Sequence, residues 1–240
     1  MNNPLDPNAN SGFASSLADM IARLRHGLGI TAIGLVLGVV VAYAALASFG
    51  AVEVLLSLWQ PAHAPGQIGW HGFNPILLLV PTVSGLLIGG LLVWLTPRRP
   101  VELADVIHAA HEPDPVVSRT GGYVSLVKSV LAIGAGSTTG LYGPLVVLGA
   151  SLAASTKRLL NLSPQYAEMA LGAGVAAAIS AAFSAPLAGI LFAHEVVLRH
   201  YNLRFFAPVS LASATAYVFS GEVLNQHISI LPIFETRMAG

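Results

Sequence analysis

The chain has 240 residues, of which 55% are apolar and only 9% are charged, and its mean hydropathy is +0.72. Soluble domains carry about 25% charged residues, so this composition predicts a polytopic integral membrane protein. The formal net charge is zero and no basic patch is present, which removes electrostatic support for nucleic-acid binding. The absence of cysteine excludes disulfides and thiolate metal sites.

The N-terminal region precedes the first apolar span. Residues 1–10 are rich in Asn and Pro and are predicted to be disordered. From 11 to 26, apolar residues recur at three- and four-residue steps, which predicts an amphipathic helix in the membrane interface. The chain is therefore divided into an N-terminal tail with this interfacial helix (1–27), a membrane half-domain (28–220) and a C-terminal tail (221–240).

Two spans come first in the membrane half-domain. No Asp, Glu, Lys or Arg lies between Arg25 and Glu53. This gap exceeds the roughly 20 residues that a membrane helix needs. Spans are expected at 28–58 and 75–95, separated by a polar loop at 60–74.

Basic residues set the expected orientation. Arg23 and Arg25 precede the first span, and Arg98 and Arg99 follow the second, so all four share one side of the membrane. The positive-inside rule makes that side cytoplasmic and predicts a cytoplasmic N-terminus in the plasma (inner) membrane. No cleaved signal peptide is expected, because no basic start precedes an early apolar run.

The next part of the chain is irregular. A short helix is predicted at 101–110, too short to cross a bilayer, followed by a polar break at 112–115. A helix at 123–133 leads into a glycine-rich stretch, 134–149, and a helix at 144–160 continues from it.

The last part is rich in small residues. Ser163 and Pro164 are a suitable cap and first residue for a helix. Residues 167–182 are nearly all Ala and Gly, which favours a place inside the bundle, away from lipid. Further helices are predicted at 186–197 and 205–219.

The glycine-rich stretch carries the main functional hypothesis. It has five glycines and Pro144 inside an apolar segment, and Gly140 to Pro144 is predicted to be a loop that opens into a helix beginning near Pro144. Free N–H groups at a helix N-terminus attract anions, and irregular backbone in a membrane lines wet cavities or lies buried in protein. This pattern predicts a mid-membrane anion site. The alternative is close helix packing through Gly134, Gly136 and Gly140.

Two motifs resemble one known family. The segment AAFSAPLAGILF at 181–192, with Glu195 behind it, resembles the "AAFNAPLAGxLFxxE" segment of the CLC chloride channels and transporters. The segment GLYGP at 140–144, with Gly149 five residues on, resembles the family's "GREGP…G" motif, and Lys128 stands where the family usually has a lysine. The resemblance covers about 28–219 and only the N-terminal half of the two inverted halves of a CLC subunit. It implies an all-α integral membrane fold with short, broken and re-entrant helices.

The resemblance also implies a set of site residues. CLC proteins are homodimers with one anion pathway in each subunit. The residues that match the stretch whose backbone amides contact the anion, and the proline after it, are Gly140, Leu141, Tyr142, Gly143 and Pro144.

Three positions depart from the family pattern. Tyr142 stands at the gating glutamate, Val101 replaces the serine that holds the anion, and Val196 replaces the internal proton-transfer glutamate. A tyrosine cannot compete with chloride as a carboxylate does, although its O–H can donate to a halide. Both carboxylates needed for proton coupling are absent. Tyr142 is interpreted either as a plug or as a working gate.

Lys128 and Glu195 are expected to be buried charges. Because charge inside a membrane is costly, a functional or neutralising role is expected for Lys128, with snorkelling to the interface as the alternative. Glu195 is expected to cap or bond to nearby backbone. His194 and Glu195 begin a zinc-protease pattern, but Leu198 stands at the second histidine. No enzyme activity, metal or cofactor is expected, with chloride or a similar anion as the transported ligand.

Two functions remain open. The first is passive, channel-like transport of chloride or a similar anion, with the pore completed by another copy or by a second half-length subunit. The second is a non-conducting structural, regulatory or truncated CLC relative. In either case the lipid bilayer is a partner, and self-association is expected through 186–197 and 205–219.

Overall fold

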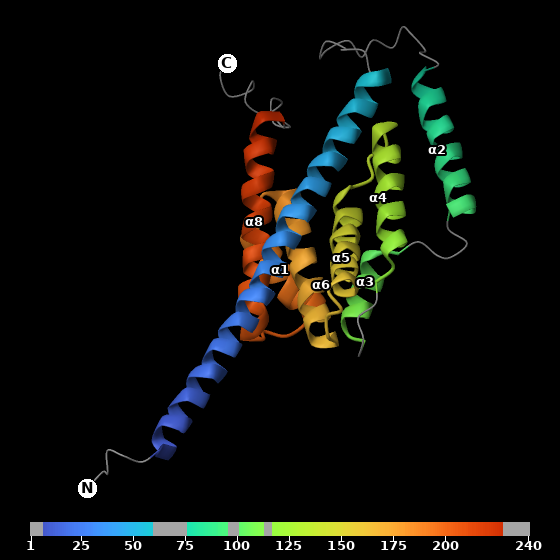
Figure 1. The fold of residues 1–240 in the computed structure, drawn as a ribbon. Coiled ribbons are helices and arrows are strands. Elements are labelled where there is room, and N and C mark those ends of the chain that lie inside the picture. Colours follow the sequence, from blue (N-terminus) through green and yellow to red (C-terminus); the bar gives the residue numbers. More distant parts are fainter. Residues whose placement is uncertain (1–6, 60–75, 96–100, 113–116, 228–240) are drawn as a thin grey trace.

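The computed structural model describes residues 7–59, 76–95, 101–112 and 117–227. Within these ranges the chain is helical and contains no β-strand (Figure 1). The helices in chain order are α1 (Pro7–Trp59), α2 (Ile76–Leu95), α3 (Leu103–Ala110), α4 (Arg119–Gly134), α5 (Tyr142–Leu159), α6 (Pro164–Phe183), α7 (Pro186–Phe192), the π-helix η1 (Ala193–Leu198) and α8 (Leu203–His227).

The small-residue segment lies at the centre of the bundle, as predicted. Ala173, Ala176 and Ala177 of α6 are completely buried, and α6 packs against α1, α5, α7 and α8 (Figure 1). Side chains no larger than a methyl group let the neighbouring backbones approach closely. The core is therefore built around α6 from short side chains and close helix contacts.

Glycines mark two of the closest helix crossings. A Cβ atom added to Gly149 of α5 would overlap the backbone carbonyl of Gly174 of α6, and the reverse is also true. In the same way, Gly34 of α1 lies against the backbone of Pro208 of α8. At these two crossings no side chain fits between the helices, so the positions of α5 and α8 relative to the core are closely fixed.

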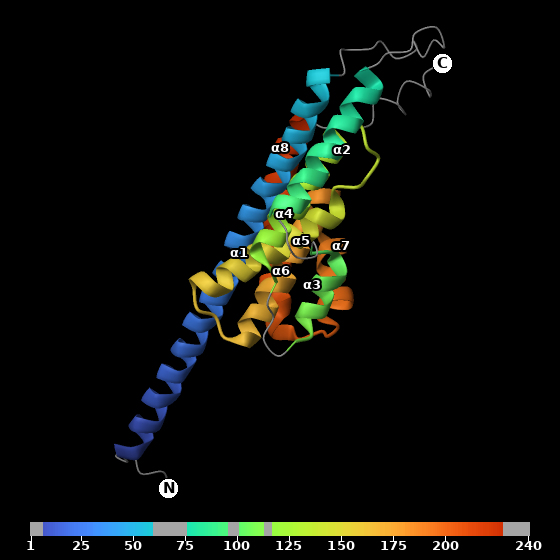
Figure 2. The same cartoon turned by 90° about the vertical axis from the view of Figure 1, so that its right-hand side faces the viewer.

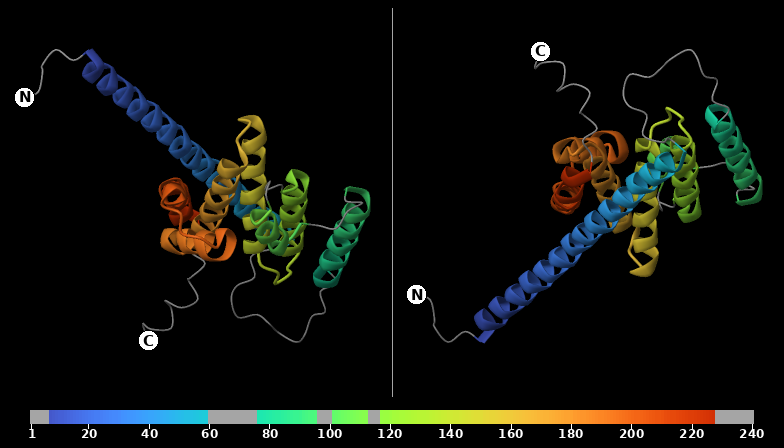
Figure 3. Two further views of the ribbon diagram at one scale, coloured as in Figure 1. Left: turned by 90° about the horizontal axis from the view of Figure 1, so that it is seen from below. Right: turned by 90° about the horizontal axis from the view of Figure 1, so that it is seen from above.

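The N-terminal region differs from the prediction. The predicted interfacial helix at 11–26 and the first span at 28–58 form one continuous helix, α1, which projects well beyond the rest of the bundle (Figure 3). Residues 7–10, expected to be disordered, are its first turn, whereas 1–6 lie outside the described residues. The glycines between the two segments do not break the helix, because an internal glycine costs only about 1 kcal/mol relative to alanine.

Of three other predicted elements, one begins at a different residue, one agrees with the prediction and one lies outside the described residues. Helix α4 begins at Arg119 rather than 123, because Ser118 caps it by accepting a hydrogen bond from the Gly121 N–H at 3.2 Å. Helix α2 agrees with the predicted second span and stands at the edge of the bundle beside α4 (Figure 2). The predicted loop at 60–74 lies outside the described residues.

The predicted helix at 186–197 has two parts. Pro186 is the first residue of α7, as expected, but the chain changes to the π-helix η1 at Ala193. Ser184 takes a left-handed conformation, φ 52°, and so separates α6 from α7. Ser163 stands at the predicted N-cap of α6, although its side chain makes no cap hydrogen bond.

Candidate functional site

The candidate site begins where α4 ends. Gly136 has a positive φ of 92°, a conformation that glycine adopts without steric cost. Its N–H bonds to the Ile133 carbonyl at 2.8 Å, and the Ser137 N–H bonds to the Ala132 carbonyl at 2.9 Å. These bonds satisfy carbonyls of the last turn of α4. Gly136 is therefore needed to stop the helix and turn the chain into the loop.

The loop that follows is exposed and held by its own side chains. Residues 136–140 are all exposed. The hydroxyls of Ser137 and Thr139 lie 3.0 Å apart, and the Thr139 N–H donates to the Ser137 Oγ at 3.3 Å. Such short-range side-chain bonds define the turn without burying it.

The start of α5 presents free backbone donors. Leu141 is the N-cap and is buried, and the Leu145 N–H bonds to its carbonyl at 3.1 Å. The amides of Tyr142 and Gly143 precede this bond and have no acceptor within the helix, and Pro144 has no N–H. Together with the helix dipole, these amides give the tip of α5 a partial positive charge. The loop thus opens into a helix as predicted, two residues before Pro144.

The glycines of this stretch do not share one role. Gly134 follows the close-packing alternative, since a Cβ there would press on Leu55 of α1. At Gly140 the nearest atom to such a Cβ is Cδ2 of Tyr142, at 3.8 Å, and at Gly143 nothing lies within 4 Å. Packing therefore explains the glycines at the two ends of the stretch, Gly134 and Gly149, and leaves Gly140 and Gly143 with open space.

The side chain at the gate position stacks on a second aromatic ring. Tyr142 lies against Phe183, the last residue of α6, with ring centroids 4.2 Å apart and an interplanar angle of 21°. Tyr142 is 44% exposed and Phe183 is 53% exposed. Phe183 belongs to the 181–192 motif, but the sequence alone assigns it no role, because a contact between residues so far apart in the chain requires the fold.

Val101 lies in an apolar contact. Its half-buried side chain packs so closely on Gly121 of α4 that a Cβ on the glycine would overlap it. Val101 precedes Glu102, the N-cap of α3, whose N–H donates to Asp105 Oδ2 at 2.8 Å. Val101 offers no side-chain donor to an anion.

The two residues that were expected to be buried charges differ in their exposure. Lys128 of α4 is half-buried. Glu195 of η1 is exposed, so the expectation of a buried charge is wrong for it, and its partner is a side chain rather than backbone. The Tyr201 hydroxyl donates to Glu195 Oε1 at 2.8 Å, and this hydrogen bond raises the pKa of Tyr201. Glu195 lies in η1 and Tyr201 in the turn before α8, and both are exposed in the described chain.

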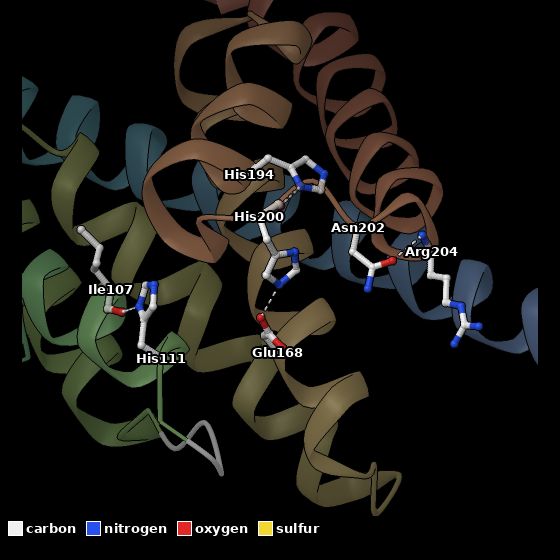
Figure 4. A network of polar contacts seen from close by, with 7 residues as sticks. All are labelled: Ile107, His111, Glu168, His194, His200, Asn202 and Arg204. Carbon is white, nitrogen blue, oxygen red and sulfur yellow. Dashed lines mark hydrogen bonds and ion pairs between the residues drawn. The ribbon is translucent and has the colours of Figure 1, made fainter.

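A second polar cluster joins α6, η1 and the turn before α8 (Figure 4). His200 Nε2 lies 2.7 Å from Glu168 Oε1 of α6, and His194 Nδ1 lies 3.1 Å from the His200 carbonyl oxygen. His194 is buried and its ring stacks near Tyr201 and Phe206. No three His, Asp or Glu side chains converge into a metal site in the part of the chain that the structure describes. This cluster ties three segments together away from the glycine-rich loop.

Comparison with known proteins identifies the family. The sequence profile of the voltage gated chloride channels matches residues 84–237, well over half of the chain and including both motifs. The chain belongs to this family. It is 36% identical over 122 residues to the chloride channel protein CLC-e of Arabidopsis thaliana, covering 51% of this chain and 17% of that protein. It is 29% identical over 165 residues to the voltage-gated ClC-type chloride channel ClcB of Salmonella typhi, covering 67% and 39%.

A solved structure supports the fold. A slow cyanobacterial Cl⁻/H⁺ antiporter matches with a TM-score of 0.62 and 21% sequence identity, over 81% of this chain and 46% of that one. The chain thus spans less than half the length of these relatives, which agrees with the predicted resemblance to one half. The family and the apolar helices, of which Gly29–Leu58 and Tyr166–Phe183 are long and apolar enough to span, make it an all-α integral membrane protein.

Proposed function

We propose that this chain forms one half of a transmembrane pathway for chloride or a similar anion. The observation that carries the proposal is the start of α5, where an exposed glycine-rich loop meets a helix N-terminus with free amides at Tyr142 and Gly143. Such an end favours an anion through both hydrogen bonds and the helix dipole. Lys157 and Arg158 in the last turn complement the negative end of the same helix.

Conduction is proposed to be passive. Proton coupling needs carboxylates that can take up and release protons, and the two matching positions hold Tyr142 and Val196. Glu195, next to Val196, is exposed and bonded to Tyr201. The solved antiporter is only 21% identical to this chain. Its structure therefore supports the fold of this chain and carries no argument about proton coupling.

The rest of the pathway is proposed to come from another chain, either a second copy or a separate half-length subunit. A site open to the surface at Gly140 and Gly143 has room for such a partner. Self-association is proposed through 186–197 and 205–219, where Leu187, Leu191 and Phe206 are exposed.

The proposed orientation is a cytoplasmic N-terminus. Helices α6 and α8 begin at the end of the bundle from which the N-terminal part of α1 projects (Figure 1). Basic residues stand near these starts, including Lys157, Arg158 and Arg204. The positive-inside rule places this end in the cytoplasm.

Anion flux from chloride-loaded liposomes that contain only this chain tests the proposal. Wild type, Tyr142→Ala and Tyr142→Glu are compared, with Tyr123→Ala as a control because Tyr123 of α4 is similarly exposed, at 48%. Flux in the wild type, raised several-fold by Tyr142→Ala and not by Tyr123→Ala, supports conduction by copies of this chain. Flux in Tyr142→Ala, with none in the wild type, identifies the tyrosine as a plug.

The alternative is a non-conducting relative with a structural or regulatory role. The stacking of Tyr142 on Phe183 favours it, since an aromatic pair occupies the place of the mobile carboxylate. Silence of every variant, both alone and when reconstituted with a chain that resembles the missing half, would support this alternative and contradict conduction.

A further inference from the structure

The tyrosine at the gate position contacts a ring on a second helix, and the contact joins one end of each helix. Tyr142 is the first residue of α5 and Phe183 is the last residue of α6. Their rings stack at 4.2 Å with nearly parallel planes, although each ring is about half exposed. Ser184, directly after Phe183, leaves the helix in a left-handed conformation, so Phe183 stands at the tip of α6.

The close packing that fixes the two helices lies at their crossing, at some distance from the ring contact. The backbones of α5 and α6 are in contact at Gly149 and Gly174. In α5, every residue from Leu145 to Ser151 is buried. Tyr142 precedes Gly149 by seven positions, about 10 Å along the helix, and Phe183 follows Gly174 by nine positions, about 13 Å. The packed crossing therefore fixes where the two tips meet, while the rings themselves lie outside the core.

The tyrosine ring also lies beside the glycine-rich loop. A Cβ on Gly140 would have Cδ2 of Tyr142 as its nearest neighbour, at 3.8 Å. The same ring therefore has Gly140 as one neighbour and Phe183 as another. Gly140 itself is exposed, and the tyrosine ring is the nearest group beside it apart from its own chain neighbours.

We propose that Phe183 is a positioning residue for the gate, which holds the Tyr142 ring beside Gly140 by stacking. The two rings act as one aromatic lid, and the pathway opens when they separate. This inference rests on the proposed function of Tyr142 in an anion pathway. An offset aromatic pair favours the stacked state by about two- to tenfold, which is enough to bias a gate without locking it.

The test uses the absence of cysteine from the chain. A Gly140→Cys reporter, for which the structure has room, is reacted with a negatively charged methanethiosulfonate reagent in detergent micelles. The backgrounds are wild-type Phe183, Phe183→Ala, Phe183→Leu and Phe183→Tyr. A Thr138→Cys reporter in the same exposed loop, two residues before Gly140, detects general unfolding of the loop.

The expected result is a rate of modification at Gly140→Cys about two- to tenfold higher in Phe183→Ala and Phe183→Leu, from the loss of the aromatic pair. Phe183→Tyr keeps an aromatic ring and should leave the rate unchanged, and Thr138→Cys should react alike in all backgrounds. Equal rates at Gly140→Cys in all backgrounds, or a similar rise at Thr138→Cys, would overturn the proposal.

Flux measurements on the Phe183 variants without the reporter separate this proposal from the proposed function. If Phe183→Ala changes the thiol rate and no variant conducts, the positioning role stands and conduction fails. If Tyr142→Ala conducts while Phe183→Ala changes neither the thiol rate nor the flux, conduction stands and the positioning role fails.

Discussion

Helices α5 and α6 form one pair with two very different regions. In the middle, Gly149 and Gly174 bring the backbones into contact, and the surrounding residues are buried. At the tip, Gly143 has open space and the rings of Tyr142 and Phe183 are half exposed. Glycine thus serves two purposes in a single helix. In the middle it permits contact between backbones, and at the tip it leaves backbone amides accessible.

The largest effect is expected from Gly149→Ala. The added methyl group would overlap the Gly174 carbonyl, and overpacking of this kind costs about 1–3 kcal/mol of unfolding free energy. The measurement is the midpoint of SDS-induced unfolding in mixed micelles. Gly143→Ala is the matched control, with the same change in the same helix. Equal midpoints for the two variants would remove the distinction between middle and tip.

The next effect concerns the assembly. Leu187, in the first turn of α7, is 74% exposed. Leu187→Glu should convert the proposed oligomer into a monomer, because burying an unpaired charge at an interface is strongly unfavourable. Light scattering of the purified protein gives the mass. Leu159→Glu, at an exposed leucine beside Lys157 and Arg158, should leave the oligomer intact. An unchanged mass for Leu187→Glu would count against this face.

A smaller loss is expected from Ser151→Ala, which tests how the middle of α5 is joined to α4. Ser151 is fully buried, and its single hydroxyl proton is shared between the carbonyl oxygens of Ser118, 3.0 Å from Oγ, and Val147, 2.8 Å from Oγ. Removing the hydroxyl should lower the unfolding free energy by about 0.5–1.5 kcal/mol. The control is Ser155→Ala, because the Ser155 hydroxyl donates to the Ser151 carbonyl of its own helix, at 2.9 Å. A larger loss at Ser155 than at Ser151 would contradict this ranking.

The smallest effect is expected from Gly143→Ala itself. Because space is open at this position and alanine favours a helix, stability should stay level or rise by at most about 0.5–1 kcal/mol. The thermal midpoint of the purified assembly gives the sign. A clear loss would mean that the tip is packed in the assembly against a second chain, and the contrast with the middle would then apply to the isolated chain alone.

Local backbone chemistry made much of the fold predictable. Pro164 and Pro186 each begin a helix, as expected from a residue that lacks an N–H and has a fixed φ. The break in the glycine-rich stretch and the helix that follows it were also predicted, as was the interior position of α6. These features depend on a few neighbouring residues or on side-chain size, and both are visible in the sequence.

Features that depend on tertiary contacts were not predictable. The stacking of Phe183 on Tyr142 and the contact of His200 with Glu168 join residues from separate helices, and no periodicity indicates them. Glu195 lies in the π-helix η1 and is exposed, and no pattern in the sequence indicates this change from α-helical geometry. The roles of Lys128 and Val101 stay predictions.

Helix α1 is longer than any membrane is thick. Its 53 residues extend over about 80 Å, against about 40–45 Å for a bilayer with its headgroups. Even at a tilt of about 40° it extends about 61 Å along the membrane normal, so roughly 16–21 Å of that extent lies beyond the headgroups. The helix therefore spans the membrane and also extends beyond it. A fluorophore on its first turn would sit in water and would report, by its distance from labelled lipids, how deeply the bundle is set in the membrane.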